Sequence, residues 1–170
     1  DIVVKGPSFA AYDFISNFCD AEWESNSGPL ACPGTEGDEA GFVMRVDSPK
    51  LENGDRVDGA ALLTYPRDNK NGYITGTYPA VTVERGDRFR ALLSCSYNDE
   101  RCNVIFRLEF RSAGEVYKLG SWNEAYEGRY FSIDLDLNSL AGMRGKFILT
   151  VLANGSARDD AALWVSPRII

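Results

Sequence analysis

The feature that most constrains the fold is a strict alternation of apolar and polar residues along several segments, which is the period of a β-strand. In segment 103–111 the two alternating sets are Val104, Phe106, Leu108 and Phe110 against Ile105, Arg107, Glu109 and Arg111. Segments 130–137, 88–97 and 41–47 repeat the pattern. Strands with one buried face and one wet face are typical of antiparallel sheets.

The turn residues between these segments support an all-β chain. Asn53-Gly54, Asn71-Gly72 and Asn154-Gly155 can supply the positive φ that tight turns need. Segment 138–142 predicts one short helical turn, and no ten-residue stretch has a helical apolar stripe. With 170 residues, about nine or ten short strands and no linker, we expect one domain over 1–170. The predicted fold is a two-sheet antiparallel β-sandwich of the jelly-roll type.

Charge and composition exclude several functions. A net charge of −7 with no basic stripe argues against nucleic acid and anionic membrane as partners. No apolar run approaches the roughly 20 residues of a membrane span. The chain contains no histidine, so it cannot use a Ser-His-Asp triad, a Cys-His pair or a histidine metal site. Carboxylate, tyrosine, lysine and hydroxyl chemistry stay available.

Four cysteines, Cys19, Cys32, Cys95 and Cys102, allow three pairings. The local pairing, Cys19 with Cys32 and Cys95 with Cys102, is favoured because each bond closes a short loop, the second across a hairpin tip. Free buried thiols are one alternative, and zinc is another, but no Cys-x-x-Cys spacing is present. Disulfides predict a secreted, extracellular protein.

With the strands assigned, the chain resembles the jelly-roll carbohydrate-binding modules of bacterial secreted glycosidases, a galactose-binding-like group. Three pieces carry the resemblance. They are AYDFISN with AEWESN, then YPAVTVERGDRFRALLSC with NVIFRLEF, and finally FSIDLDLNSLAGMRGKFILTVLANG followed by DDAALWVSPRI. Ser166 stands where the group usually has an aspartate before the final proline. The resemblance implies a non-catalytic glycan-binding domain.

Aromatic and planar polar side chains are the residues that bind sugars, because a pyranose C–H face stacks on a ring while its hydroxyls need hydrogen-bond partners. Segment 121–130 concentrates both kinds, and segment 69–78 adds two tyrosines beside asparagines. The candidate ligand-binding residues are Trp122, Asn123, Glu124, Tyr126, Arg129, Tyr130, Tyr73 and Tyr78. Trp122 and Tyr126 could instead cap the core, since aromatic side chains bury large areas. Trp23 and Trp164 lie in strands, where core packing is favoured.

No cofactor is required by this reading, but the resemblance implies that a structural Ca²⁺ can lie between the first and last strands. The matching positions are Asp13 with Asp159 or Asp160. Calcium takes several carboxylate and carbonyl oxygens from flexible loops. Glu36, Asp38 and Glu39 form a second acidic loop for which a solvated surface is the simpler interpretation.

We therefore expect a glycan-binding module, monomeric, that forms part of a larger secreted protein. A small jelly-roll lyase or glycoside hydrolase is the alternative. Its carboxylates would come from Glu22, Glu24, Glu124 and Glu127, or a lyase would use Tyr126, Arg129 and Tyr130. A structural or adhesion domain is the third alternative. The sequence does not identify the sugar.

Overall fold

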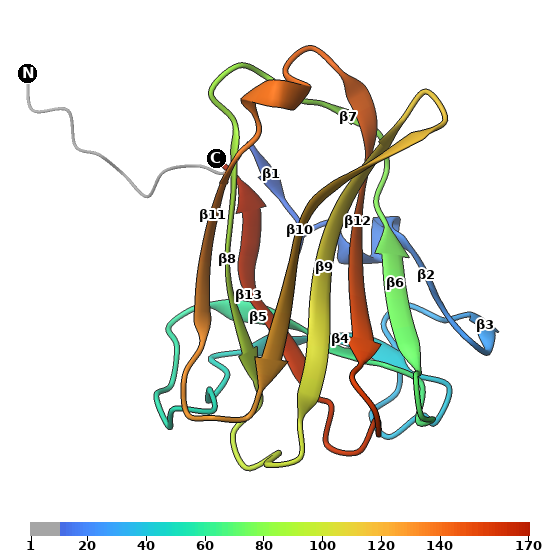
Figure 1. Ribbon diagram of the computed structural model, residues 1–170, viewed down its shortest axis with the longest axis vertical. Coiled ribbons are helices and arrows are strands. Elements are labelled where there is room, and N and C mark those ends of the chain that lie inside the picture. Colours follow the sequence, from blue (N-terminus) through green and yellow to red (C-terminus); the bar gives the residue numbers. More distant parts are fainter. Residues whose placement is uncertain (1–10) are drawn as a thin grey trace, which may run out of the picture.

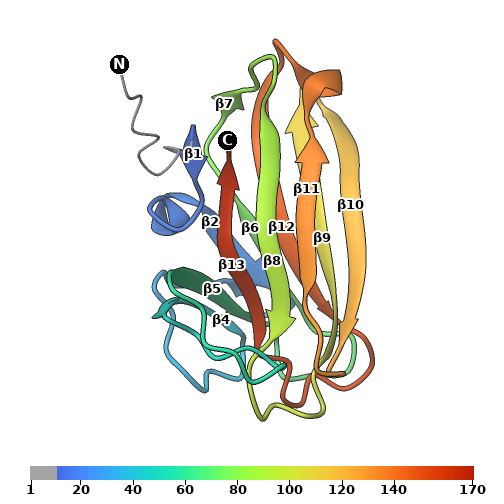
Figure 2. The same cartoon turned by 90° about the vertical axis from the view of Figure 1, so that its left-hand side faces the viewer.

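The computed structural model describes residues 11–170, which form two antiparallel sheets packed face to face (Figures 1 and 2). The predicted jelly-roll β-sandwich is confirmed. Two-residue strands raise the number of strands to thirteen in the described residues, above the nine or ten expected. The predicted helical turn is also confirmed, as the 3₁₀ helix η2 (Asn138–Leu140), and a second one, η1, spans Phe18–Asp20.

The first sheet, sheet A, has the order β11-β8-β13-β5-β4, with β1 on the other half of β13. Its strands are β1 (Tyr12–Asp13), β4 (Phe42–Asp47), β5 (Ala60–Tyr65), β8 (Arg88–Cys95), β11 (Phe131–Asp136) and β13 (Ala162–Ile169). The second sheet, sheet B, has the order β10-β9-β12-β6-β2-β3, with β7 paired to β12. Its strands are β2 (Glu22–Ser25), β3 (Gly28–Pro29), β6 (Tyr73–Thr77), β7 (Val81–Thr82), β9 (Asn103–Ser112), β10 (Glu115–Ala125) and β12 (Arg144–Ala153).

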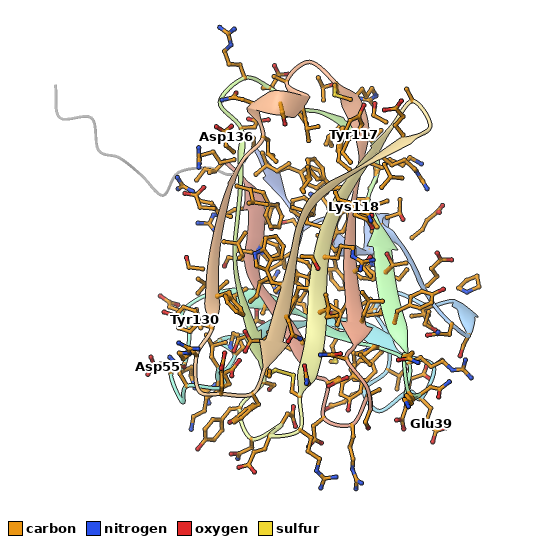
Figure 3. The ribbon with its side chains drawn as sticks, viewed as in Figure 1. Glu39, Asp55, Tyr117, Lys118, Tyr130 and Asp136 are labelled. Atoms are coloured by element: carbon orange, nitrogen blue, oxygen red, sulfur yellow. A yellow bond between two sulfur atoms is a disulfide. The ribbon has the colours of Figure 1, made fainter. Side chains whose placement is uncertain are left out.

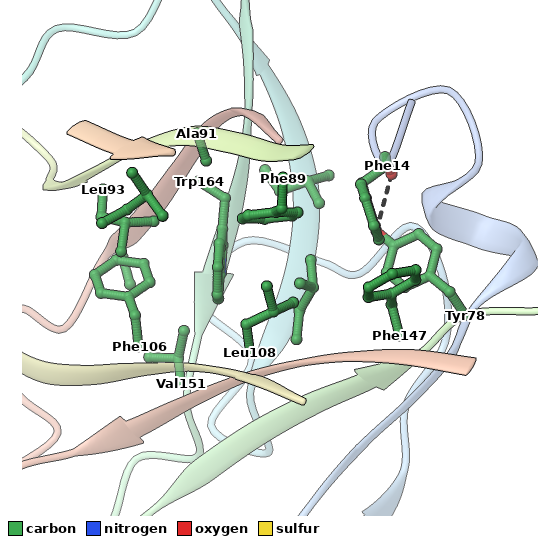
Figure 4. Close-up of a cluster of buried hydrophobic side chains, with 14 of the residues drawn as sticks. Phe14, Tyr78, Phe89, Ala91, Leu93, Phe106, Leu108, Phe147, Val151 and Trp164 are labelled. Atoms are coloured by element: carbon green, nitrogen blue, oxygen red, sulfur yellow. Dashed lines mark hydrogen bonds between the residues drawn. The ribbon is translucent and has the colours of Figure 1, made fainter. Parts of the chain in front are cut away.

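The core lies between the inner faces of the two sheets (Figure 4). On β9 the four apolar residues of the sequence pattern are fully buried, as expected for the inner face. Trp164 of β13 is buried among them, with its ring edge-to-face on Phe106 at 5.0 Å between centroids. The two sheets are therefore joined by interleaved aromatic side chains.

Both predicted disulfides form, Cys19–Cys32 and Cys95–Cys102. The second ties the end of β8 to the start of β9 across a hairpin whose tip contains Asn98 with φ +71°. A ring of this size stabilises the fold by about 2.5 kcal/mol in the chain-entropy model.

A long loop, residues 48–59, covers part of the outer face of sheet A. Leu51 and Val57 pack there on Ala61, Leu163 and Val165. This small second core holds the loop against the sheet and directs residue 52 toward the end of β8, since Leu51 bridges to Ser96. In the described residues no helix has the length and apolar character needed to cross a membrane.

Candidate functional site

The segment between β10 and β11 presents exposed aromatic rings to solvent. β10 ends at Ala125, the chain turns at Gly128 with φ +76°, and β11 starts at Phe131. Tyr130 is 41% exposed and Phe131 is 36% exposed. Figure 3 shows Tyr130 at the edge of the sandwich, on the same side as Asp55 of the 48–59 loop.

These two rings line a cavity of about 260 Å³ together with Glu127 and Arg129. We call it the Tyr130 pocket. Arg129 Nη2 lies 3.4 Å from Glu127 Oε2, so a hydrogen-bond donor and an acceptor stand beside the rings. Flat rings next to charged groups can bind a ligand that has both a C–H face and hydroxyl groups.

The loop that carries the pocket is fixed from below by the buried side chain of Glu52. Its Oε2 accepts hydrogen bonds from the amides of Glu127 at 2.8 Å and Gly128 at 3.2 Å. Its Oε1 accepts one from the amide of Cys95 at 3.1 Å. Only 4% of Glu52 is exposed. The sequence pattern did not single out this residue, because LENGD has the composition of an exposed turn.

Glu124 is completely buried and faces the interior, which corrects its assignment as a ligand-binding residue. One of its carboxyl oxygens lies within 4.8 Å of a carboxyl oxygen of Glu52. Among the described residues, no donor group reaches either oxygen of Glu124. Burial, followed by the neighbouring Glu52 and Glu127, raises the pKa of Glu124 to about 10. Glu124 is therefore a neutral acid at physiological pH.

Trp122 and Tyr126 are half-buried and pack against the main core. The Trp122 ring lies on Gly120, where any side chain would collide with it. Tyr126 is fixed at both ends: its amide donates to Cys102 O at 2.9 Å, and its Oη accepts from the amide of Asn98 at 3.1 Å. Neither ring lines the Tyr130 pocket, and both pack against the core instead.

Tyr73 and Asn123 lie on a different surface, the outer face of sheet B. The strand register places them in one cross-strand row with Leu152 and Ile105 between them. Three strand spacings separate the two residues by roughly 14 Å. The structure therefore does not bring these two residues together, and neither lines the Tyr130 pocket.

Tyr78 is 1% exposed and belongs to the aromatic core, which corrects its prediction as a ligand-binding residue. Its hydroxyl donates to Phe14 O at 2.8 Å, a bond drawn in Figure 4. Burial is the main reason that the pKa of this phenol is raised well above its usual range. Tyr78 stabilises the fold and has no access to a ligand.

The three candidate calcium ligands are not brought together. Asp13 pairs with Arg168 near the C-terminal end of β13, whereas Asp159 and Asp160 come before its N-terminal end. Asp13 instead organises its own turn by accepting hydrogen bonds from the Ile15 amide and the Ser16 hydroxyl. A single ion cannot bind to both ends of this strand.

At the other end of β13, Asp160 is fully buried. Its Oδ1 accepts from the Asn103 amide at 2.9 Å, and its Oδ2 has no partner in the part of the chain that the structure describes. Burial, and then the charge of Asp159, raises the pKa of Asp160 to about 7 and that of Asp99 to about 6. Even so, the one group of three candidate ligand atoms within 4.8 Å of one another in residues 11–170 is elsewhere, at Glu52, Cys95 and Glu124.

Three larger concavities contain none of the exposed aromatic rings. The first, of about 640 Å³, lies over the Cys19–Cys32 disulfide and is lined by polar side chains of β2 and by Arg111. The second, of about 450 Å³, is lined by residues of β8, β11 and β13 and has no aromatic residue. The third, of about 350 Å³, is lined by acidic residues beside Tyr65, whose ring is stacked on the buried Phe42. For a ligand that stacks on an open ring, the Tyr130 pocket is therefore the better candidate.

This architecture defines a jelly-roll β-sandwich of the kind found in carbohydrate-binding modules. The sequence itself matches no protein-family model and no curated protein. Among solved structures, the carbohydrate-binding module TmCBM61 in complex with β-1,4-galactotriose superimposes with a TM-score of 0.53 at 11% identity, covering 93% of each chain. A CBM51 from Clostridium perfringens GH95, in complex with methyl-galactose, does so with a TM-score of 0.50 at 15% identity, covering 76% of this chain and 88% of that one.

A Stig cyclase, Fisc from Fischerella sp. TAU, shares the fold to a similar degree, with a TM-score of 0.51 at 10% identity over 96% of this chain and 90% of that one. At these identities the likeness establishes the fold alone. The function must therefore be argued from the surface of this chain.

Proposed function

We propose that this domain binds a glycan without cleaving it, and that the sugar stacks on the rings of the Tyr130 pocket. The observation that carries the proposal is the exposure of Tyr130 and Phe131 in a cavity that also contains Arg129 and Glu127. The two carbohydrate-binding modules of the same fold, with their galactose-type ligands, support the substrate class. β-1,4-Galactan and galactosides are thus the first ligands to test.

Glycan cleavage by two carboxylates is not favoured. Glu22 and Glu24 are on β2, which lies four strands away from β10 in sheet B, and Glu127 follows the end of β10. The carboxyl pair that does lie close together, Glu52 and Glu124, is sealed from solvent and cannot touch a polysaccharide. A glycosidase needs both of its carboxyl groups at the substrate.

We further propose an extracellular location, with the domain attached to a larger secreted protein. Both disulfides support it, because such bonds persist in oxidising compartments. The positive charge that nucleic acid or an anionic lipid surface would need is lacking, since the net charge is −7.

Replacing Tyr130 with alanine is expected to weaken glycan binding by about tenfold or more, or about 1.4 kcal/mol, because the stacking ring is lost. Isothermal titration calorimetry and affinity electrophoresis against a panel containing β-1,4-galactan measure the effect. Val116→Ala is the control, since Val116 is 52% exposed and lies near the start of β10, outside the Tyr130 pocket. Unchanged affinity in Tyr130→Ala, or no retention of the wild-type protein on any glycan, would contradict the proposal.

Calcium binding stays a prediction. The unpartnered Oδ2 of Asp160, with Asp159 next to it, favours a cation at this end of β13, whereas Asp13 lies too far away to contribute. We expect the melting temperature of the wild-type protein to be higher in CaCl₂ than in EDTA. In Asp160→Asn the melting temperature should be the same in both. Identical melting curves in CaCl₂ and EDTA would dismiss the ion.

A further inference from the structure

The Glu52–Glu124 pair lies at the meeting point of four segments. Glu52 comes from the 48–59 loop, Glu124 from β10, Cys95 from the end of β8, and the Glu127 and Gly128 amides from the loop that carries the Tyr130 pocket. The disulfide Cys95–Cys102 closes the site on the remaining side. Movement of Glu52 would therefore be transmitted directly to the pocket.

The hydrogen-bond donors around Glu52 favour its ionised form, the carboxylate. Three backbone amides point at its two oxygens, and amide N–H groups donate most strongly to a charged acceptor. The Ser94 hydroxyl adds a longer contact of 3.4 Å to Oε1. None of these donors reaches Glu124 in the described structure, since both of its oxygens lack partners.

Two buried carboxylates without a counter-charge cannot lie this close, because each is desolvated and they repel each other. The charged groups facing Glu124 are Glu52, Glu127 and Arg129, of which only Arg129 is positive and it is exposed. A single proton on Glu124 removes the repulsion and leaves Glu52 free to accept the three amides.

A metal ion between the two carboxyl groups is the rival explanation. Calcium takes six to eight oxygen ligands. The third candidate atom beside the two carboxyl oxygens is the sulfur of Cys95, which is engaged in a disulfide. The described residues therefore favour the proton.

We infer that Glu52 is a positioning residue for the Tyr130 pocket, and that a proton held by Glu124 keeps the Glu52 carboxylate beneath the loop. The inference rests on the proposed function, since it assigns to the pair the task of shaping the glycan site. Neither residue contacts the ligand.

The test compares Glu52→Gln, Glu124→Gln and the control Glu84→Gln, an exposed residue outside the pocket and the carboxyl pair. Amide hydrogen exchange by NMR at neutral pH, without glycan, reads the loop directly. In Glu52→Gln one carboxyl oxygen becomes an NH₂ group, so some of the three amides lose their acceptor. We expect protection at Cys95, or at Glu127 and Gly128, to fall by about tenfold or more. Strand amides of β12 should be unaffected.

Glu124→Gln keeps a neutral donor of similar size next to Glu52, so loop protection should be preserved at neutral pH. The pH profile of glycan affinity gives a readout that a merely structural role would not change. The wild-type protein and Glu84→Gln should lose affinity as Glu124 ionises near pH 10, and Glu124→Gln should lose less. The same alkaline loss in all three proteins would overturn the inference.

Two further outcomes separate the explanations. If CaCl₂ raises the melting temperature of the wild-type protein but not that of Glu124→Gln, a bound cation and not a proton explains the carboxyl pair, and the inference is refuted. Preserved loop protection and full glycan affinity in Glu52→Gln would refute the positioning role while leaving the proposed function intact. Lost loop protection in Glu52→Gln, in a protein that binds no glycan, would refute the proposed function alone.

Discussion

Replacing Trp164 with alanine should lower the free energy of unfolding by about 3–5 kcal/mol, the range for removing a large buried aromatic side chain. Trp164 is completely buried and contacts the opposite sheet through Phe106. Its neighbours in register on β8 and β5, Leu93 and Leu62, are also completely buried, so the cavity cannot collapse easily. For a chain of this length the melting temperature should fall by roughly 6–20 °C.

Trp164→Phe is the matched control. The indole Nε1 is buried and has no acceptor in residues 11–170, so phenylalanine removes an unsatisfied donor while keeping a ring in the cavity. Its cost should be about 1–2 kcal/mol, well below that of alanine. Chemical denaturation followed by circular dichroism measures all three proteins. Equal losses in the two variants would mean that the N–H, and not the ring volume, stabilises the sandwich.

Glu124→Gln should change how stability depends on pH. In the folded protein the pKa of Glu124 is about 10, against 4.5 for an ordinary glutamate. Between these values the folded state holds a proton that the unfolded state releases. The stability from this group is thus fully present below about pH 4.5 and declines as pH rises toward 10. A glutamine has no such dependence.

We therefore expect the wild-type protein to lose at least about 1 kcal/mol more stability than Glu124→Gln between pH 5 and pH 8. One proton can change the free energy of unfolding by at most about 1.4 kcal/mol per pH unit. Urea unfolding at a series of pH values measures it. Asp99 and Asp160 also have raised pKa values, but their contributions are common to both proteins and cancel in the difference. Parallel stability curves would show that Glu124 is already ionised in the folded state.

The sheets and their faces could be predicted because the alternation in the sequence is local. On β9 and β8 every second residue is apolar, and a strand exposes alternate residues to opposite faces, so the inner face follows directly. The disulfide pairing was predictable for the same reason, since each bond closes a short loop. The helical turn at 138–140 also depends on neighbouring residues alone.

The candidate site was predicted only in part. Of the residues that line the Tyr130 pocket, Tyr130 and Arg129 were candidates from the sequence because they stand in a polar, aromatic segment. Phe131 was not a candidate, because it begins an alternating strand. Trp122 and Glu124 share one face of β10, while Ser121 and Asn123 share the other. That alternation is the signal that could have assigned Trp122 and Glu124 to the interior.

Glu52 could not have been found from the sequence. Its hydrogen-bond partners at 95 and at 127–128 are 43 and 75–76 positions away along the chain, and only the packing of the 48–59 loop on sheet A brings them together. The separation of Asp13 from Asp160 was hidden for a similar reason, because it depends on the register of β1 against β13.

The pairing of β1 with the last residues of β13 has a practical consequence for experiments. Tyr12 and Ile169 are neighbours, and they lie at the end of the sandwich opposite the loop that joins β8 and β9 (Figure 1). Along β13, Ile169 lies roughly 16 Å from Trp164, whose β8 neighbour Leu93 pairs with Phe131 of the pocket. A biotin, a fluorescent reporter or a chip linker attached beside Ile169 should therefore leave the aromatic rings of the pocket accessible to immobilised sugars.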